Sequence, residues 1–275
     1  MTRFDRLSSS YDALLHDPIR DRFTGNESMF FHRRKADLIR RFFKRRSMPT
    51  SGLRYLDVGC GNGELLRLLQ SDFKRSAGCD NSAGMLRQTA GIETRLQQNS
   101  LRIPFGDAKL DLVTAVCVYH HVAPGHRATL TADIGRVLRP GGVFCFSVWD
   151  RIEENDFAAV ATDVLAELFP RDPPRFMART PHGYHDKAAI ARDVARAGFA
   201  ARPRIATLPE RSRAASPMDA AIAYCQGTPL RNEIEARDPG RLAEATDAMA
   251  EAIAVKFGRG AVDGKIQAHV VEVDA

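Results

Sequence analysis

The apolar residues of this chain fall into short continuous runs that are separated by segments of helical spacing. Between residues 53 and 149, strand-like runs such as LRYLDV (53–58), LDLVTAVCV (110–118) and GVFCFSVW (142–149) alternate with helical patterns. Apolar runs of this kind are typical of strands that are covered on both faces, as in a parallel sheet. The pattern therefore predicts an α/β fold with a doubly wound, mostly parallel sheet and right-handed crossovers.

The two ends of the chain depart from this alternation. Residues 1–50 are polar with a helical pattern, and we expect them to form an N-terminal helical lid ahead of a main domain at 51–275. Mostly helical patterns also fill about 209–264, between the strand-like RPRIATLP (202–209) and a last strand, IQAHVVEV (266–273). A helical insertion between two strands is expected to cap a pocket at one end of the sheet.

Charge and cysteine content narrow the class of protein. Of the net charge of +6, residues 33–46 carry +7, from eight Lys/Arg and one Asp, so the basic character is local. Apolar residues in this segment recur at helical spacing, which indicates a docked helix with a solvated basic face; a polyanion-binding patch is the alternative. No membrane span or signal sequence is evident, and five cysteines without a CxxC pair favour reduced thiols in a cytoplasmic protein.

The most informative stretch is YLDVGCGNGELLRLL (55–69), a strand, a glycine loop and a helix. Gly59, Gly61 and Gly63 permit a tight turn and a close approach of the backbone to a ligand. Their spacing differs from the dinucleotide fingerprint, and the nearby acidic Asp57 and Glu64 disfavour a pyrophosphate. Asp80 ends the next strand, where a carboxylate can accept both hydroxyls of a ribose. The sequence therefore predicts a site for an adenosine with a cationic tail, a description that S-adenosylmethionine fits.

Five segments carry a resemblance to a known family. LDVGCGNG, GCDNSAGML, NSLRIPF, LDLVTAVCVYHHV and RVLRPGGVFCFS stand in the order and spacing of the class I S-adenosylmethionine-dependent methyltransferases, over roughly residues 53–149. The sequence is most similar to the small-molecule branch that includes ubiquinone and menaquinone biosynthesis enzymes. The resemblance implies a Rossmann-like, seven-stranded, mostly parallel sheet, S-adenosylmethionine as cofactor and a small-molecule methyl acceptor.

The same resemblance assigns roles to individual residues. It implies that Asp57, Gly59 and Gly61 hold the methionine end of the cofactor and that Asp80 binds the ribose. Asn99 stands where the family usually has an Asp that contacts the adenine amino group, and an amide oxygen can also accept from that group. Further residues are expected around the cofactor: Cys60 through its backbone, Asn81, Met85, Ser100 and Cys117, with Tyr11 placed over it from the lid.

The stretch CVYHHVAPGH (117–126) follows the fourth predicted strand, at the edge of the sheet where ligands bind. A metal site is disfavoured, because adjacent histidines usually diverge and no C-x₂-C or H-x₃-H partner is near. A general base is more credible, with His121 favoured over His120, if the acceptor must lose a proton. Tyr184 is a further candidate for the wall of the substrate pocket. The alternative is that it only packs at the start of a helix.

Three functions therefore stay open. The favoured one is a small-molecule methyltransferase that acts by in-line transfer, without nucleic-acid or membrane partners. The second is an RNA methyltransferase that grips phosphates with the basic segment, although the fourth strand lacks the Asn/Asp-Pro-Pro-Tyr/Phe motif and no Pro-Cys or Thr-Cys pair is present. The third is a cofactor-binding protein without turnover. The glycine spacing disfavours a dehydrogenase.

Overall fold

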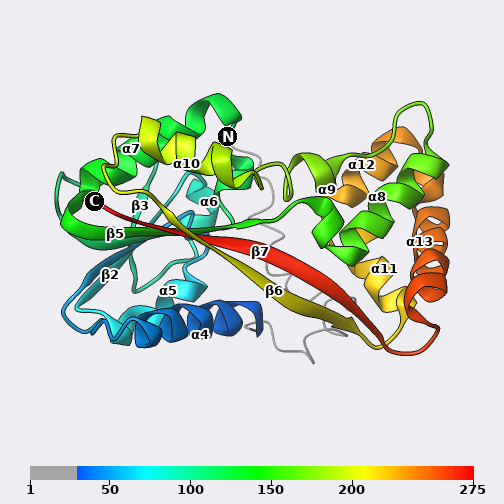
Figure 1. Ribbon diagram of the computed structural model, residues 1–275, viewed down its shortest axis with the longest axis horizontal. Coiled ribbons are helices and arrows are strands. Elements are labelled where there is room, and N and C mark those ends of the chain that lie inside the picture. Colours follow the sequence, from blue (N-terminus) through cyan, green and yellow to red (C-terminus); the bar gives the residue numbers. More distant parts are fainter. Residues whose placement is uncertain (1–29) are drawn as a thin grey trace.

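The computed structural model describes residues 30–275, which fold around one seven-stranded sheet (Figure 1). Its strand order is β3-β2-β1-β4-β5-β7-β6. Six strands run in the same direction, and β7 runs in the opposite one. The predicted α/β class with a mostly parallel sheet is confirmed. The strands are β1 (Arg54–Val58), β2 (Arg75–Asp80), β3 (Glu93–Leu96), β4 (Leu110–Val116), β5 (Leu138–Trp149), β6 (Arg204–Ala214) and β7 (Val262–Asp274).

Helices cover both faces of the sheet because successive strand residues point to opposite sides. On one face, Tyr55 packs with the helices α4 (Phe30–Arg45) and α5 (Glu64–Leu69). On the other face, Leu56 packs with α7 (Arg127–Val137) and α10 (Lys187–Arg196). The strands that these helices cover are buried on both sides, which explains why they read as continuous apolar runs.

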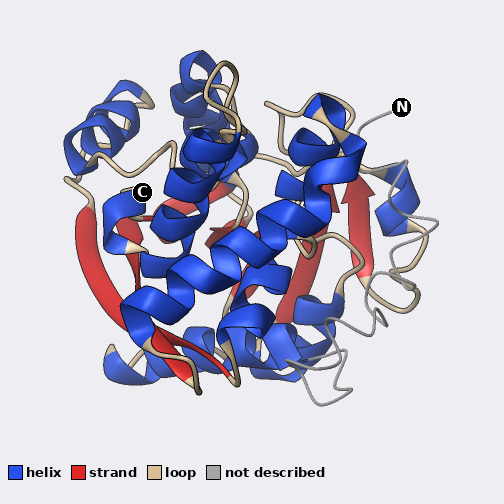
Figure 2. Cartoon of the chain, turned by 90° about the vertical axis from the view of Figure 1, so that its right-hand side faces the viewer, coloured by secondary structure: helices blue, strands red, loops and turns tan. Residues whose placement is uncertain are grey.

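A second helical unit lies beyond the end of the sheet, at the right of Figure 1 and facing the viewer in Figure 2. It has its own apolar core, built from two separate stretches of the chain. The first stretch provides α8 (Asp156–Leu168) and α9 (Phe176–Arg179); the second provides α11 (Pro217–Cys225), α12 (Leu230–Arg237) and α13 (Leu242–Phe257).

The helical insertion, predicted at about 209–264, is shorter in the structure, mainly at its beginning. β6 and β7 stay paired as far as Ala214 and Val262, so the two strands form a long ribbon that leads to the second helical unit. The outer half of β6 is mostly solvent-exposed, and its polar residues hid the strand pattern. Pro209 is tolerated because β6 is an edge strand.

The remaining short elements are one α-helix and five 3₁₀ turns. They are α6 (Ala83–Leu86), η1 (Gln70–Asp72), η2 (Tyr119–His121), η3 (Pro124–His126), η4 (Ile152–Glu154) and η5 (Pro239–Arg241). All five cysteines are free thiols, as the sequence predicted. Within residues 30–275, no helix has the length and apolarity to cross a bilayer.

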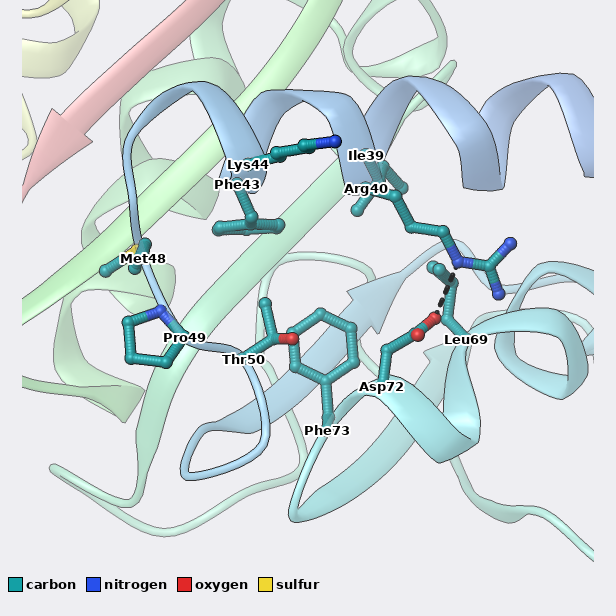
Figure 3. Close-up of a pocket in the computed structure, with 10 residues that line it drawn as sticks. All are labelled: Ile39, Arg40, Phe43, Lys44, Met48, Pro49, Thr50, Leu69, Asp72 and Phe73. Carbon is teal, nitrogen blue, oxygen red and sulfur yellow. Dashed lines mark hydrogen bonds and ion pairs between the residues drawn. The ribbon is translucent and has the colours of Figure 1, made fainter.

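The basic segment 33–46 lies largely in α4, which docks through Ile39, Phe42 and Phe43. Arg41 and Lys44 are exposed to solvent. A pocket of about 240 Å³ lies between α4 and the chain that leads into β2, as Figure 3 shows. It lies near the amino ends of β1 and β2, whereas the glycine loop follows the carboxyl end of β1, so it is separate from the site described next.

Candidate functional site

The glycine loop turns sharply out of β1 and is fastened to β2. Gly59 and Gly61 both have positive φ, 73° and 57°. A Cβ on Gly59 would lie 2.5 Å from a methyl of Val118, in the loop that follows β4, so only glycine fits there. The backbone N–H groups of Gly59 and Cys60 donate to the carbonyl of Cys79, at 2.8 and 3.1 Å. The loop thus has a fixed position at the carboxyl edge of the sheet.

Asp80, at the end of β2, is tied to the same loop. One carboxylate oxygen accepts from the Gly61 N–H at 2.9 Å, and the other accepts from the Ser82 N–H at 2.8 Å. A carboxylate offers about four lone-pair sites, so Asp80 retains capacity to accept from a ligand hydroxyl. The arrangement is compatible with the predicted ribose contact, and it adds a role in shaping the loop.

Asp57, the penultimate residue of β1, is a buried carboxyl with only 3% of its surface exposed. One of its oxygens accepts from the Thr114 hydroxyl at 2.9 Å, and that hydroxyl also pairs with the Tyr55 hydroxyl at 2.8 Å. The pKa of Asp57 is raised to about 7, mainly by burial and also by the negative charge of Asp80, while the hydrogen bond from Thr114 and the charge of Lys35 act in the opposite direction. A cationic ligand group beside Asp57 and Asp80 would stabilise both carboxylates.

The residues expected near the adenine lie in two neighbouring segments. Asn81 is half-buried after β2, and Met85 is buried in α6, with its terminal methyl 3.4 Å from where a Cβ of Gly61 would stand. Asn99 and Ser100 are exposed beyond β3. Met85 thus lies against the glycine loop, while Asn81 follows β2 and Asn99 and Ser100 follow the neighbouring strand β3.

The side-chain oxygen of Asn99 has a partner that the sequence did not suggest. It accepts from the Leu101 N–H at 2.9 Å, which closes a local turn. The buried Gln97, also unforeseen, donates through its amide to the Ser100 carbonyl at 2.8 Å and holds the same turn. One lone pair of the Asn99 oxygen is therefore engaged, and the other remains for a ligand.

Cys60 and Cys117 differ sharply in environment. The Cys60 side chain is buried over Gly78, which has no room for a Cβ, and burial raises the pKa of the thiol well above its usual range. Its backbone N–H donates to the Cys79 carbonyl, and the expected contact between the Cys60 backbone and the cofactor stays a prediction. Cys117 is exposed and has a φ of 60°, a conformation that is unusual for a residue other than glycine.

His120 and His121 form η2, directly after β4. Their ring centroids are 4.0 Å apart, so the expectation that adjacent histidines diverge is wrong here. His120 is half-buried, and its pKa falls to about 3, mainly through burial and then through His121, His182 and Lys35. His121 is exposed to solvent. Among residues 30–275, no group of three His, Cys, Asp or Glu side chains is arranged to hold a metal ion.

Tyr184 does not line the site, which corrects the predicted pocket-wall role. It is 3% exposed and lies in the main core, where its hydroxyl donates to Asp193 at 3.0 Å. The Arg127 guanidinium lies over its ring at 3.9 Å, and Tyr119 stacks against it. These partners come from α7, α10 and η2, which the sequence alone did not bring together. Tyr11 lies outside the described residues.

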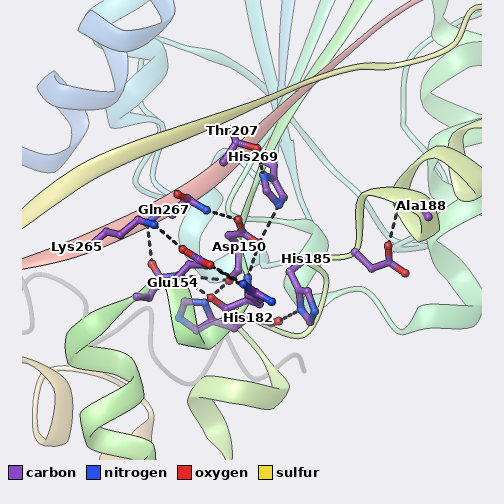
Figure 4. A network of polar contacts seen from close by, with 12 residues as sticks. Asp150, Glu154, His182, His185, Ala188, Thr207, Lys265, Gln267 and His269 are labelled. Carbon is purple, nitrogen blue, oxygen red and sulfur yellow. Dashed lines mark hydrogen bonds and ion pairs between the residues drawn. The ribbon is translucent and has the colours of Figure 1, made fainter.

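A polar network that the sequence reasoning missed surrounds Asp150, directly after β5 (Figure 4). Its carboxylate accepts from the Gln267 amide at 2.6 Å, and His269 Nε2 lies 3.1 Å from it. Its main-chain carbonyl accepts from His182 Nδ1 at 2.7 Å. Asp150 directly follows the parallel strand β5, as Asp80 ends the parallel strand β2. Its place at the carboxyl end of a strand is the sequence signal that could have singled out Asp150.

Part of the chain is similar to known proteins. Residues 56–146 match a family described as "Methyltransferase domain". The chain is 32% identical over 112 residues to a tRNA (carboxymethyluridine(34)-5-O)-methyltransferase of Arabidopsis thaliana. The aligned residues make up 40% of this chain and 27% of that protein. This chain is also 25% identical over 172 residues to the demethylmenaquinone methyltransferase of Corynebacterium kroppenstedtii. That alignment covers 59% of this chain and 74% of that protein.

Solved structures share the fold. Phosphoethanolamine N-methyltransferase 2 of Haemonchus contortus, in complex with S-adenosylhomocysteine, aligns with a TM-score of 0.50 at 17% identity, over 86% of this chain and 52% of that chain. Several curated relatives are matched over less than half of their own length.

Proposed function

We propose, from the premise that this chain carries a methyltransferase domain, that it transfers a methyl group from S-adenosylmethionine to a small-molecule acceptor. The observation that carries the proposal is the pair Asp57 and Asp80 beside the glycine loop. Asp57 is a buried carboxyl without a full countercharge, and an ammonium or sulfonium group would supply one. S-adenosylmethionine has both groups.

In this proposal, one group of residues binds the cofactor and another faces the acceptor. Asp57 and the loop of Gly59 and Gly61 hold the cationic end of the cofactor, and Asp80 holds the ribose. The cofactor supplies an activated methyl group, and the chain aligns the acceptor with it, because in-line transfer depends mainly on proximity and orientation. His120 and His121, at the end of β4, form the wall on the acceptor side.

The change Gly61→Arg tests the cofactor assignment. A Cβ at Gly61 meets only the flexible end of Met85, so the cost to the fold is the strain of a side chain at a positive φ, about 1–2 kcal/mol. Titration calorimetry is expected to show S-adenosylmethionine binding in the wild type and none in the variant. Gly91→Arg is the matched control, because that glycine also has a positive φ, 79°, and nothing lies within 4 Å of a Cβ there. Binding retained by Gly61→Arg would refute the assignment.

An RNA acceptor is the second possibility, supported by the exposed cations Arg41, Lys44 and Arg45 of α4 and by the tRNA methyltransferase among the relatives. Phosphate contacts make binding fall steeply with salt. Mobility shifts with tRNA at low salt therefore separate the two acceptor classes, and the absence of a shift excludes the RNA class. A cofactor-binding protein without turnover would bind S-adenosylmethionine yet form no S-adenosylhomocysteine with any acceptor.

A further inference from the structure

A second pocket, of about 170 Å³, lies at the amino edge of the sheet, the edge at which the antiparallel β7 ends (Figure 1). Arg54 begins β1 and Arg75 begins β2, and the pairing of the two strands places these residues side by side. Glu93 begins β3, and Lys109 immediately precedes β4. The pocket is therefore assembled from four separate segments of the chain.

Positive charge exceeds negative charge in the lining of this pocket. Its cationic side chains are those of Arg54, Arg75, Arg95 and Lys109, and its one carboxylate is that of Glu93. Four cations against one carboxylate leave an excess of three positive charges. Like charges gathered in this way repel one another, so an anion bound among them would stabilise the arrangement.

Glu93 does not neutralise its neighbours, because two arginines share it. One of its oxygens accepts from Arg75 Nε at 2.8 Å, and the other accepts from Arg95 Nη2 at 3.4 Å. Within residues 30–275, the two terminal nitrogens of Arg75 have no hydrogen-bond partner. Arg95 also donates to the Pro104 carbonyl at 2.8 Å, and its guanidinium lies 4.3 Å from the centre of the Phe105 ring. Arg95 is thus fixed in place, while Arg75 keeps donors for a ligand.

The remaining two cations are balanced even less. Asp111, which is 6% exposed, accepts from Arg54 Nε at 2.8 Å and also from Arg139, so this carboxylate is shared as well. Lys109 is exposed, and its ammonium group has no hydrogen-bond or ion-pair partner in the part of the chain that the structure describes. The pocket therefore holds one cation without a counterion beside three that are partly neutralised.

These donors suit a phosphate group. Arginine binds phosphate oxygens through its planar fork of N–H groups, and lysine binds them as a point charge. Because the donors come from four segments, they fit tetrahedral oxygens better than the two coplanar oxygens of a carboxylate. A phosphate monoester carries a charge of about −1.5 to −2 at pH 7, which the local excess of positive charge would balance. The volume is smaller than the ~300 Å³ of an ordinary small-molecule pocket, so the anion must be compact.

We propose that this pocket is a phosphate site, which binds inorganic phosphate or the phosphoryl group of a small phosphate monoester. It is distinct from the candidate cofactor site, because its lining contains no residue of the glycine loop. The five residues of β1 separate the two sites by about 13 Å. The inference therefore goes beyond methyl transfer and does not depend on it.

A phosphorus NMR titration of the whole chain with inorganic phosphate, at constant ionic strength, measures the binding directly. We expect saturable binding by the wild type that weakens as sodium chloride is raised, because the charges are partly exposed. The variant Lys109→Gln removes the cation without a counterion and breaks no hydrogen bond of that side chain. Its dissociation constant should rise about tenfold, while the midpoint of urea unfolding stays unchanged. The double variant Arg75→Gln/Lys109→Gln should show no saturation.

Lys74→Gln is the matched control, because Lys74 is also exposed and stands beside Arg75 but does not line the pocket. It should change the dissociation constant by less than about twofold. Equal losses in Lys74→Gln and Lys109→Gln would overturn the proposal in favour of a diffuse basic edge, and so would a wild type that does not saturate.

Two further ligands identify the source and the chemistry of the anion. Binding of glycerol 3-phosphate at least as tightly as inorganic phosphate assigns the site to a phosphorylated metabolite, and weaker binding assigns it to free phosphate. Malonate is the dicarboxylate competitor, and we expect it to displace phosphate poorly. Displacement by malonate at an equal concentration would overturn the assignment to phosphate. Added S-adenosylmethionine should not displace phosphate, so a failure of the proposed methyl transfer would leave this test intact.

Discussion

Replacing Asp57 by Asn removes a charge from the interior while keeping its shape. The carboxyl is 3% exposed, and an amide oxygen in the same place can still accept from the Thr114 hydroxyl. The substitution should therefore stabilise the unliganded protein near neutral pH and weaken the binding of S-adenosylmethionine.

The magnitude follows from the pKa of Asp57, which rises from its ordinary value of 3.8 to about 7 in the folded protein. Each unit of pKa corresponds to about 1.4 kcal/mol, so ionising Asp57 in the unliganded fold costs about 4 kcal/mol once the pH exceeds about 7. Because the folded state holds this proton more tightly than the unfolded chain, wild-type stability falls as pH rises from about 4 to about 7. The Asn variant lacks this slope.

Urea unfolding of both proteins between about pH 5 and pH 8 tests the stability. The difference in unfolding free energy should grow in favour of Asp57→Asn by about 3 kcal/mol across this pH range, since about two of the three pKa units of the shift fall within it. Calorimetry should show wild-type affinity for S-adenosylmethionine rising by up to about tenfold per pH unit and levelling off above about pH 7. The affinity of the variant should be weak and nearly independent of pH. Parallel stability curves for the two proteins would refute the reasoning.

Three further changes test the fold around the site. Gly59→Ala places a Cβ 2.5 Å from Val118 at a positive φ, so urea unfolding should show a loss of about 1–3 kcal/mol, and adding Val118→Ala should recover part of it. Met249→Ala empties a fully buried position in the second core and should cost about 2–5 kcal/mol by the same assay; no loss would contradict the packing. Asp186→Ala removes the cap that accepts from the Ala188 N–H at 2.8 Å (Figure 4), and thermal melts should report a loss of about 1 kcal/mol, whereas Asp186→Asn should lose much less.

The sheet could be predicted from the sequence where strands are buried on both faces. Leu56 and Val113 lie in such strands, and their apolar runs are continuous for that reason. The outer half of β6 is exposed on a ribbon, so its residues, such as Pro209, carry no apolar signal. The helices α8 and α9 were also not foreseen, because the partners of Phe157 in the second core come largely from residues beyond 217.

Part of the candidate site could be singled out from position along a strand. Asp57 and Asp80 were found because each stands at or near the carboxyl end of a parallel strand. Tyr184 was placed wrongly, because its partner Asp193 lies nine residues away on α10 and its ring stacks on residues of other elements. The proximity of His182 to Asp150 depends on two loops that meet only in the folded chain, and no local pattern indicates it.

The β6–β7 ribbon determines which parts of the second helical unit can be replaced independently of the sheet. The chain leaves at Ala214 and returns at Val262, which are paired neighbours, so α11, α12 and α13 form an excursion whose ends already meet. Swapping this excursion for another would leave the glycine loop and Asp57 untouched. Its apolar side, however, fits α8 and α9, which arise from a separate part of the chain. A chimaera that exchanges the second helical unit must therefore transplant both segments together, as one matched pair.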